Sequence, residues 1–295
     1  MQALQDLLDA IIATPWLACV SVGFIGLCVG SFLNVVIYRL PRIMESEWRN
    51  DCSIILKDQL QPNHTSQVYI HMTLSKPASR CPSCAHRIRW YENIPLVSWL
   101  ALRGRCSACG TAIGIRYPIV ELLTMLASLV VLSVFGPTVK MVCALVLTWA
   151  LIALTGIDFD TQLLPDRITL PLAAAGLFVN AQSLFVSPAQ AIWGYVIGFL
   201  VLWVVYFLFK IITGKEGMGY GDFKLLAALG AWLGPMQLPL IILLSSFVGA
   251  IVGIVLLKVR KENQPFAFGP YIAIAGWISL MWGNQLVAAY LGMYH

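Results

Sequence analysis

Two aspartates beside long apolar segments are the residues of this chain best suited to chemistry. Asp158 closes one apolar run, and Asp222 ends the glycine-rich string that starts at Gly217. An ionised carboxylate at the edge of hydrocarbon costs several kcal/mol unless it is paired or protonated. Two such groups held together share a proton, so one can activate water while the other donates a hydrogen bond to a carbonyl. The pair predicts aspartic-protease chemistry at a membrane, with Asp158 and Asp222 as the catalytic residues.

Asp158 is chosen by elimination among three neighbouring acids. Asp160 lies two residues further on, so on a helix the two side chains point in different directions, and a solvated or turn role fits it better. Asp166 follows Pro165 and precedes an apolar run, which suits a helix N-cap. For Asp222 the N-cap of the following helix is the alternative role, while the glycines before it permit close backbone approach.

Four cysteines form the second constellation. They occur as two C-x2-C pairs, Cys81 with Cys84 and Cys106 with Cys109. Two tight turns of this kind can close a tetrahedron of thiolates around Zn²⁺, which leaves no open position and makes the metal structural. Two disulfides are the alternative, which a reducing compartment disfavours. Redox-active thiols and an iron–sulfur cluster remain open as well.

A second metal site is a further hypothesis for the region before these pairs. It would use three residues whose spacings match no familiar ligand pattern: Cys52, His64 and His71. The remaining cysteines lie in apolar runs and are expected to be small buried hydrophobes.

The composition indicates what positions these residues. Apolar residues make up 59% of the chain and charged residues only 11%, against roughly 25% charged residues in a soluble domain. We therefore expect an all-α polytopic membrane protein with about eight transmembrane helices, since each span needs ~20 mostly apolar residues. The sixth segment is too short to span unaided and is expected to line a cavity. The segments are 11–37, 117–136, 139–157, 168–186, 190–212, 223–235, 238–258 and 266–291.

The basic residues predict the orientation. With the N-terminus placed outside, 18 of the 19 Lys and Arg residues lie on the inner side of the membrane and only Lys140 lies on the outer side. The positive-inside rule then puts the loop 39–116 in the cytoplasm. The same rule accounts for the net charge of +5, so no nucleic-acid partner is expected. The first apolar segment is expected to stay as a span, because residues 1–10 lack the basic start of a signal peptide.

Three domains follow from this arrangement. Residues 1–38 form the first transmembrane helix, 39–116 a cytoplasmic domain with the four-cysteine metal module, and 117–295 a membrane aspartyl protease domain. The cytoplasmic domain is small for an independent core and needs a staple such as a metal. The insert 44–79 carries no assignable role.

With these motifs in this order, the sequence resembles the type IV prepilin peptidases, intramembrane aspartyl proteases of the GxGD kind. The resemblance covers nearly the whole chain. It is carried by Gly30 to Pro41, the cysteine pairs enclosing Glu92 to Leu100, Arg116 to Glu121, Asp158 with Leu164 to Asp166, and Gly217 to Lys224.

The resemblance implies a substrate and a second reaction. Such enzymes lie in the bacterial inner membrane and cleave the basic leader of type IV prepilins or type II secretion pseudopilins at the cytoplasmic face. Many then methylate the new N-terminal residue with S-adenosylmethionine. The family's catalytic aspartates fall on Asp158 and Asp222, and its metal thiolates on the four cysteines. The methyltransferase assignment rests on the resemblance alone, because the chain has no glycine-rich nucleotide fingerprint.

Two glutamates are candidates for contacts with the leader or the cofactor. Glu92 lies between the cysteine pairs and Glu121 lies early in the second span. Their alternative roles are an ordinary surface acid and a favourable charge at a helix N-terminus. Two other functions are open: a peptidase without methyl transfer, and a proton-coupled transporter or scaffold. The sequence indicates no oligomeric state.

Overall fold

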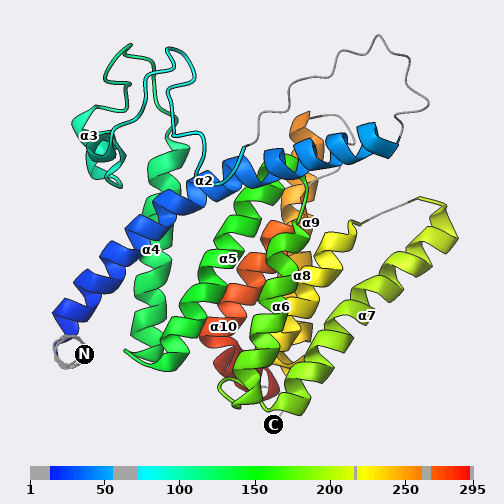
Figure 1. Cartoon of the computed structure of the whole chain (residues 1–295). Helices are drawn as coiled ribbons and strands as arrows, with labels where there is room; N and C mark the ends of the chain where they lie inside the picture. Colours follow the sequence, from blue (N-terminus) through cyan, green and yellow to red (C-terminus); the bar gives the residue numbers. More distant parts are fainter. Residues whose placement is uncertain (1–13, 56–71, 216–217, 261–266, 293–295) are drawn as a thin grey trace. The chain divides into compact units, whose positions relative to one another are not determined.

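The computed structural model describes residues 14–55, 72–215, 218–260 and 267–292, and within them it is helical without a β-strand. Six helices are long and apolar enough to cross a membrane (Figure 1). The chain is thus an integral membrane protein of the all-α polytopic class, as predicted. The long helices are α2 (Pro15–Ile55), α4 (Arg116–Phe135), α5 (Val139–Thr161), α7 (Pro188–Thr213), α9 (Leu238–Arg260) and α10 (Gly269–Gly292).

Two shorter helices complete the set of eight predicted segments. They are α6 (Asp166–Ala181) and α8 (Tyr220–Leu233), with 16 and 14 residues. The prediction that the sixth segment is too short to span unaided is confirmed by α8. The first segment differs, because α2 runs past the predicted end at residue 37 to Ile55 and includes Pro41. Polar helix-forming residues continue it, and Arg49 pairs with Glu45 one turn back. Residues 11–13 and 266 of the predicted spans lie outside the described residues.

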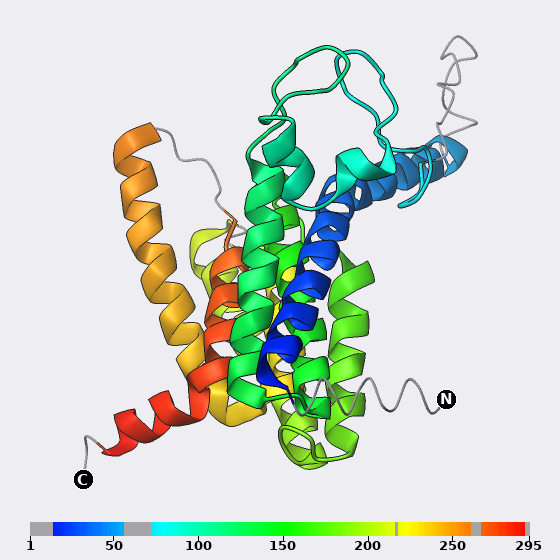
Figure 2. The same ribbon diagram turned by 90° about the vertical axis from the view of Figure 1, so that its left-hand side faces the viewer.

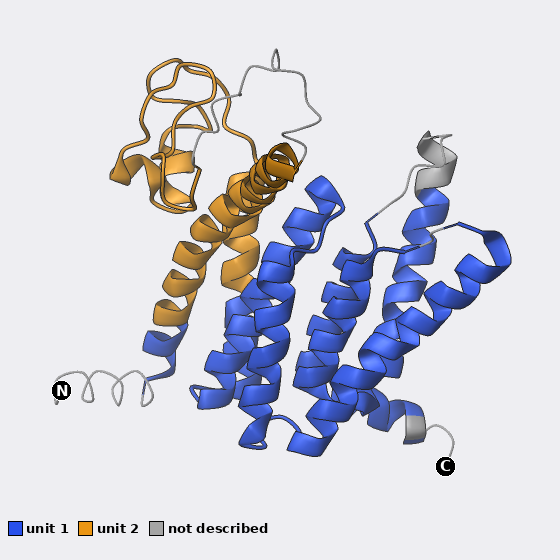
Figure 3. Cartoon of the chain, turned by 45° about the vertical axis from the view of Figure 1, so that its right-hand side comes forward, with its two compact units in different colours: residues 1–19, 127–295 blue, residues 20–126 orange. Residues whose placement is uncertain are grey.

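The chain divides into two compact units, residues 1–19 with 127–295 and residues 20–126 (Figure 3). In the first unit α8 is the central helix and packs against α6, α7 and α10. Eleven of its 14 residues are buried. From Leu225 to its end the helix is apolar on every side, a pattern typical of a helix surrounded by others. Residues on the outer helices are exposed instead, for example Phe178 at 79% and Ile212 at 81%, as expected of side chains that face lipid.

Glycines let α7 and α8 come into backbone contact. A Cβ added to Gly194 would lie 2.1 Å from the carbonyl oxygen of Gly230, and one added to Gly198 would lie 2.7 Å from that of Leu226. Small residues at such crossings are what membrane helices use to pack closely. Any side chain here would push the two helices apart.

A hydrogen-bonded cap fixes the far end of α8. The Asn180 amide donates to the carbonyl oxygens of Ala231 and Trp232 at 2.8 and 3.0 Å. The Trp232 indole in turn donates to the Leu172 carbonyl at 2.8 Å. Because buried polar groups are costly when unpaired, these bonds hold α6 and α8 in one register.

In the second unit α2 crosses α4 at Gly30 (Figure 2). A Cβ on Gly30 would lie 2.7 Å from the Cα of Glu121. One helical turn later the Asn34 amide donates to the Tyr117 carbonyl at 3.1 Å. Arg39 then donates to three carbonyl oxygens of the following loop, those of Thr73, Leu74 and Pro77. These contacts give structural roles to the motif Gly30 to Pro41.

Candidate active site and metal centre

Asp158 lies in the last turn of α5. Its carbonyl oxygen accepts the N–H of Gln162, whose left-handed backbone (φ 54°) ends the helix. The Asp158 side chain is buried, with 4% of the residue exposed. Among the described residues its Oδ2 atom has no hydrogen-bond partner. A buried carboxylate oxygen without a partner is costly, and such a feature is typical of a site that receives a proton or a ligand.

Asp222 lies in the first turn of α8. The helix begins at Tyr220 with Gly219 as its N-cap, so Asp222 is not the cap itself. Its backbone N–H donates to the Gly219 carbonyl at 3.2 Å. The residue is 7% exposed. Negative charge at this end of a helix is favourable, which makes the position suitable for a buried carboxylate. Gly217, the first glycine of the predicted string, lies outside the described residues.

Three helix ends converge around these two acids. The carboxylates interact electrostatically with each other. Leu164 fills the space beside them, since a Cβ on Gly221 would lie 2.7 Å from its Cβ. A Cβ on Gly269, at the start of α10, would lie 2.6 Å from Asp158 Oδ2. The absence of a side chain at Gly269 thus makes room for the Asp158 carboxylate.

The neighbouring acids have other roles. Asp160 is exposed. Asp166 was expected to cap the next helix, but that prediction is wrong because Pro165 is the cap and Asp166 is the first helical residue. Its carboxylate accepts from Lys224 Nζ at 2.7 Å through both oxygens. The Asp166 carboxylate therefore pairs with a lysine of α8, whereas a capping role would pair it with a backbone N–H group of its own helix.

The four cysteine sulfurs come together in the second unit. The atoms of Cys81, Cys84, Cys106 and Cys109 all lie within 4.8 Å of one another. Two contacts, of 3.8 and 4.0 Å, each join one pair to the other. These distances exceed the S–S bond length of about 2.05 Å, and all eight cysteines are free. The cluster can therefore hold one metal ion, in keeping with a four-thiolate site.

The two C-x2-C turns have the same construction. In the first, the Cys81 N–H donates to the His86 carbonyl at 2.9 Å, and in the second the Cys106 N–H donates to that of Thr111 at 2.8 Å. The residue after each pair has a positive φ, 57° at Ala85 and 71° at Gly110. Both turns thereby direct two sulfurs to one side. The hypothesised second site is not tested, because His64 and His71 lie outside the described residues.

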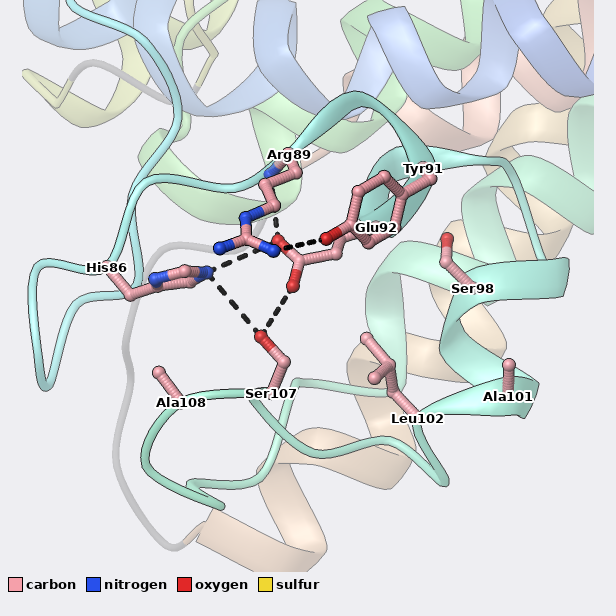
Figure 4. Close-up of a pocket in the computed structure, with 9 residues that line it drawn as sticks. All are labelled: His86, Arg89, Tyr91, Glu92, Ser98, Ala101, Leu102, Ser107 and Ala108. Carbon is pink, nitrogen blue, oxygen red and sulfur yellow. Dashed lines mark hydrogen bonds and ion pairs between the residues drawn. The ribbon is translucent and has the colours of Figure 1, made fainter.

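Glu92 connects the two cysteine turns (Figure 4). Its carboxylate accepts the Arg89 backbone N–H at 2.8 Å and the Ser107 hydroxyl, and it contacts His86 Nε2 at 3.3 Å. These hydrogen bonds, that of Arg89 first, lower the pKa of Glu92 to about 2. The side chain is only 9% exposed. Glu92 is thus an internal acceptor of the module, and the alternative of an ordinary surface acid does not describe it.

Glu121 holds a strained turn. It is 8% exposed, and its Oε2 accepts the backbone N–H of Leu96 at 2.8 Å. Leu96 has φ 58°, a region that residues with side chains rarely adopt. The Glu121 carboxylate stabilises this conformation by accepting a hydrogen bond from the Leu96 N–H. Sequence reasoning found Glu121 by its charge but gave no indication of this bond.

The fold and the two centres define a polytopic membrane protein with a small four-cysteine module. Residues 24–135 match the family model described as Bacterial Peptidase A24 N-terminal domain, and residues 145–254 match that described as Type IV leader peptidase family. The chain therefore belongs to the type IV leader peptidase family, as its motifs indicated.

Curated relatives are similar over nearly the full length. A protein of Stutzerimonas stutzeri is 54% identical over 90% of this chain and 91% of the relative. One of Pseudomonas aeruginosa is 52% identical over 97% and 98%, and one of Dichelobacter nodosus 46% over 95% and 96%. Each is named prepilin leader peptidase/N-methyltransferase. No solved structure matches the chain significantly.

Proposed function

We propose that this protein cleaves the basic leader of type IV prepilins or type II secretion pseudopilins and then N-methylates the new N-terminal residue. The observation that carries the peptidase half is the burial of two interacting aspartates, Asp158 and Asp222, at converging helix ends. The names of the relatives support both halves.

The two aspartates would act as a pair that holds one proton. The ionised carboxylate takes a proton from water, and the resulting nucleophile attacks the scissile carbonyl. The protonated partner donates a hydrogen bond to the carbonyl oxygen, and the proton then passes to the leaving amine as the C–N bond breaks. The unpartnered Oδ2 of Asp158 is a suitable acceptor for the water.

The substrate would lie across the interface between membrane and cytoplasm. A basic leader stays on the cytoplasmic side, while the apolar segment after it lies in the bilayer. In this proposal the N-terminus lies outside, residues 39–116 lie in the cytoplasm and the protein lies in the bacterial inner membrane. Gly219, three residues before Asp222, leaves space for an extended peptide backbone close to the acids, since a Cβ there would meet nothing nearer than Asp222 Oδ2 at 3.9 Å.

Residues 39–116 would bind both the metal ion and the methyl donor. Four thiolates suit Zn²⁺ in a closed site, so Cys81, Cys84, Cys106 and Cys109 would hold a structural ion. S-adenosylmethionine would supply the methyl group. In this division residues 1–38 are the first span and residues 117–295 form the peptidase domain.

Processing of a purified prepilin by the full-length protein in lipid tests the proposal. Mass spectrometry reads leader loss and a methyl group in one spectrum. Asp158→Asn and Asp222→Asn should each lower cleavage at least about 1,000-fold, since each removes one half of the proton pair. Asp160→Asn is the matched control and should cleave normally. Normal cleavage by either variant of the pair would contradict the dyad.

Two results would favour the other functions. Cleavage without any methyl group, in the presence of S-adenosylmethionine, would identify a peptidase alone. Failure of the wild-type protein to cleave any prepilin, with proton flux through the same vesicles, would favour the transporter. The second result would overturn the whole proposal.

A further inference from the structure

A cavity of about 450 Å³ lies beside the cysteine turns (Figure 4). Its volume is within the range of pockets that bind small molecules, roughly 300–1,000 Å³. Polar side chains form one wall, those of His86, Arg89, Glu92 and Ser107. Ala101 and Leu102 form an apolar side, and Ala108 lies next to Ser107. The cavity therefore offers different surfaces to the two sides of a ligand.

The polar wall carries both signs of charge. Arg89 supplies a guanidinium, which lies 5.8 Å from the centre of the Tyr91 ring. Glu92 supplies a carboxylate that is bonded to three groups, out of about four acceptor positions. A wall with one cation and one anion suits an amino-acid group, whose two ends carry opposite charges.

We propose that this cavity binds the methyl donor, with Arg89 facing its carboxylate and Glu92 its cationic part. This inference rests on the proposed methyl transfer. S-adenosylmethionine combines an amino-acid group, a sulfonium cation, ribose hydroxyls and a planar base. The base is suited to the apolar wall, and the Tyr91 ring at the rim offers an aromatic face.

The metal site would fix the same cavity. Ser107 and Ala108 are the two residues between Cys106 and Cys109, so a metal held by these cysteines would set the position of one wall. His86 follows Cys84 by two residues, so the first cysteine turn is joined to the same polar wall. A structural metal would therefore act on methyl transfer through the shape of the cavity, without touching the donor.

Filling the cavity tests the inference. Ala108→Trp places a large side chain at its wall, and Ser83→Trp makes the same change at the matching position of the first cysteine turn, away from the cavity. Binding of S-adenosylhomocysteine to the full-length protein in detergent would be measured by calorimetry, with prepilin cleavage as the check of folding. Ala108→Trp should weaken binding at least about tenfold, and Ser83→Trp should change it less than twofold.

A second pair removes charge instead of space. Arg89→Gln should weaken binding at least about fivefold by losing the carboxylate contact, while Arg87→Gln, two residues away and outside the cavity, should not. Suppose that both Ala108→Trp and Arg89→Gln still bind S-adenosylhomocysteine normally and still methylate. This result would overturn the cavity as the donor site and would leave the proposed methyl transfer intact. A wild-type protein that neither binds nor methylates would instead contradict the methyltransferase assignment, and the cavity with it.

Discussion

The four-cysteine cluster is built by two short turns, whereas the aspartate site is built by the ends of α5, α8 and α10. In each cysteine turn a backbone hydrogen bond and one residue of positive φ aim the sulfurs. At the aspartates the decisive contacts join residues far apart in the chain, such as Gly269 with Asp158. The first centre depends on local geometry, and the second on helix packing.

The largest effect should come from closing the space beside Asp158. Gly269→Ala puts a methyl group 2.6 Å from Asp158 Oδ2, too close for either group to stay in place. Cleavage should fall about 100-fold, because misplacement of a reacting group by about 1 Å costs that much. Metal content should not change. Gly292→Ala on the same helix has nothing within 4 Å and serves as the control in the prepilin assay. Equal loss in both variants would contradict a local cause.

The reverse test disturbs the cysteine cluster. Cys106→Ser removes one of four ligands and should abolish stoichiometric metal, measured by elemental analysis of the purified protein. Cys52→Ser is the control, since Cys52 is exposed and outside the cluster. Methylation should fall at least about tenfold and more than cleavage does. A variant that keeps one metal per chain would show that the cluster is not the site.

A substitution where α7 crosses α8 should destabilise the first unit, residues 1–19 with 127–295. Gly194→Ala places its Cβ 2.1 Å from the Gly230 carbonyl oxygen. Overpacking of this kind costs about 1–3 kcal/mol, which thermal unfolding in detergent would show as a lower Tm. Gly114→Ala is the control, because its Cβ would meet its nearest neighbour at 3.9 Å. An unchanged Tm for Gly194→Ala would mean that α7 and α8 can move apart without a loss of stability.

The cysteine module should lose stability in acid through Glu92. Its pKa of about 2 lies below its ordinary value of 4.5, so its contribution is fully present above pH 4.5 and disappears as the pH falls toward 2. Glu92→Gln should flatten this part of the unfolding curve, followed by tryptophan fluorescence. The cysteines also bind protons there and release metal, so both proteins are compared at equal metal content. Identical curves would contradict the role of the carboxylate.

The smallest effect is expected at the pair of Asp166 and Lys224. The two side chains are 51% and 30% exposed, and pairs of this kind contribute about 0.2–1 kcal/mol. Lys224→Met should lower the free energy of unfolding by no more than that, and added salt should reduce the difference. A loss above 2 kcal/mol would show that the pair matters more than its exposure indicates.

The same contrast explains what the sequence could predict. Helices and cysteine turns depend on nearby residues, so apolar runs and the C-x2-C spacing were sufficient to locate them. Gly269 was missed because nothing around it in the chain points to Asp158. Asp166 was misassigned since its partner, Lys224, comes from another helix. The extension of α2 to Ile55 was missed because a helix in water needs no apolar run.

Helix α2 is much longer than a membrane span requires. With 41 residues at 1.5 Å each the helix measures roughly 60 Å, about twice the ~30 Å of hydrocarbon in a bilayer. Its second half must therefore leave the membrane as a rod, and Pro41 is the point where that rod can bend. Arg39, two residues before Pro41, donates hydrogen bonds to the carbonyl oxygens of Thr73 and Pro77 in the loop after α2. The hydrogen bonds of Arg39 thereby tie the start of the cysteine-containing segment to the part of α2 next to Pro41.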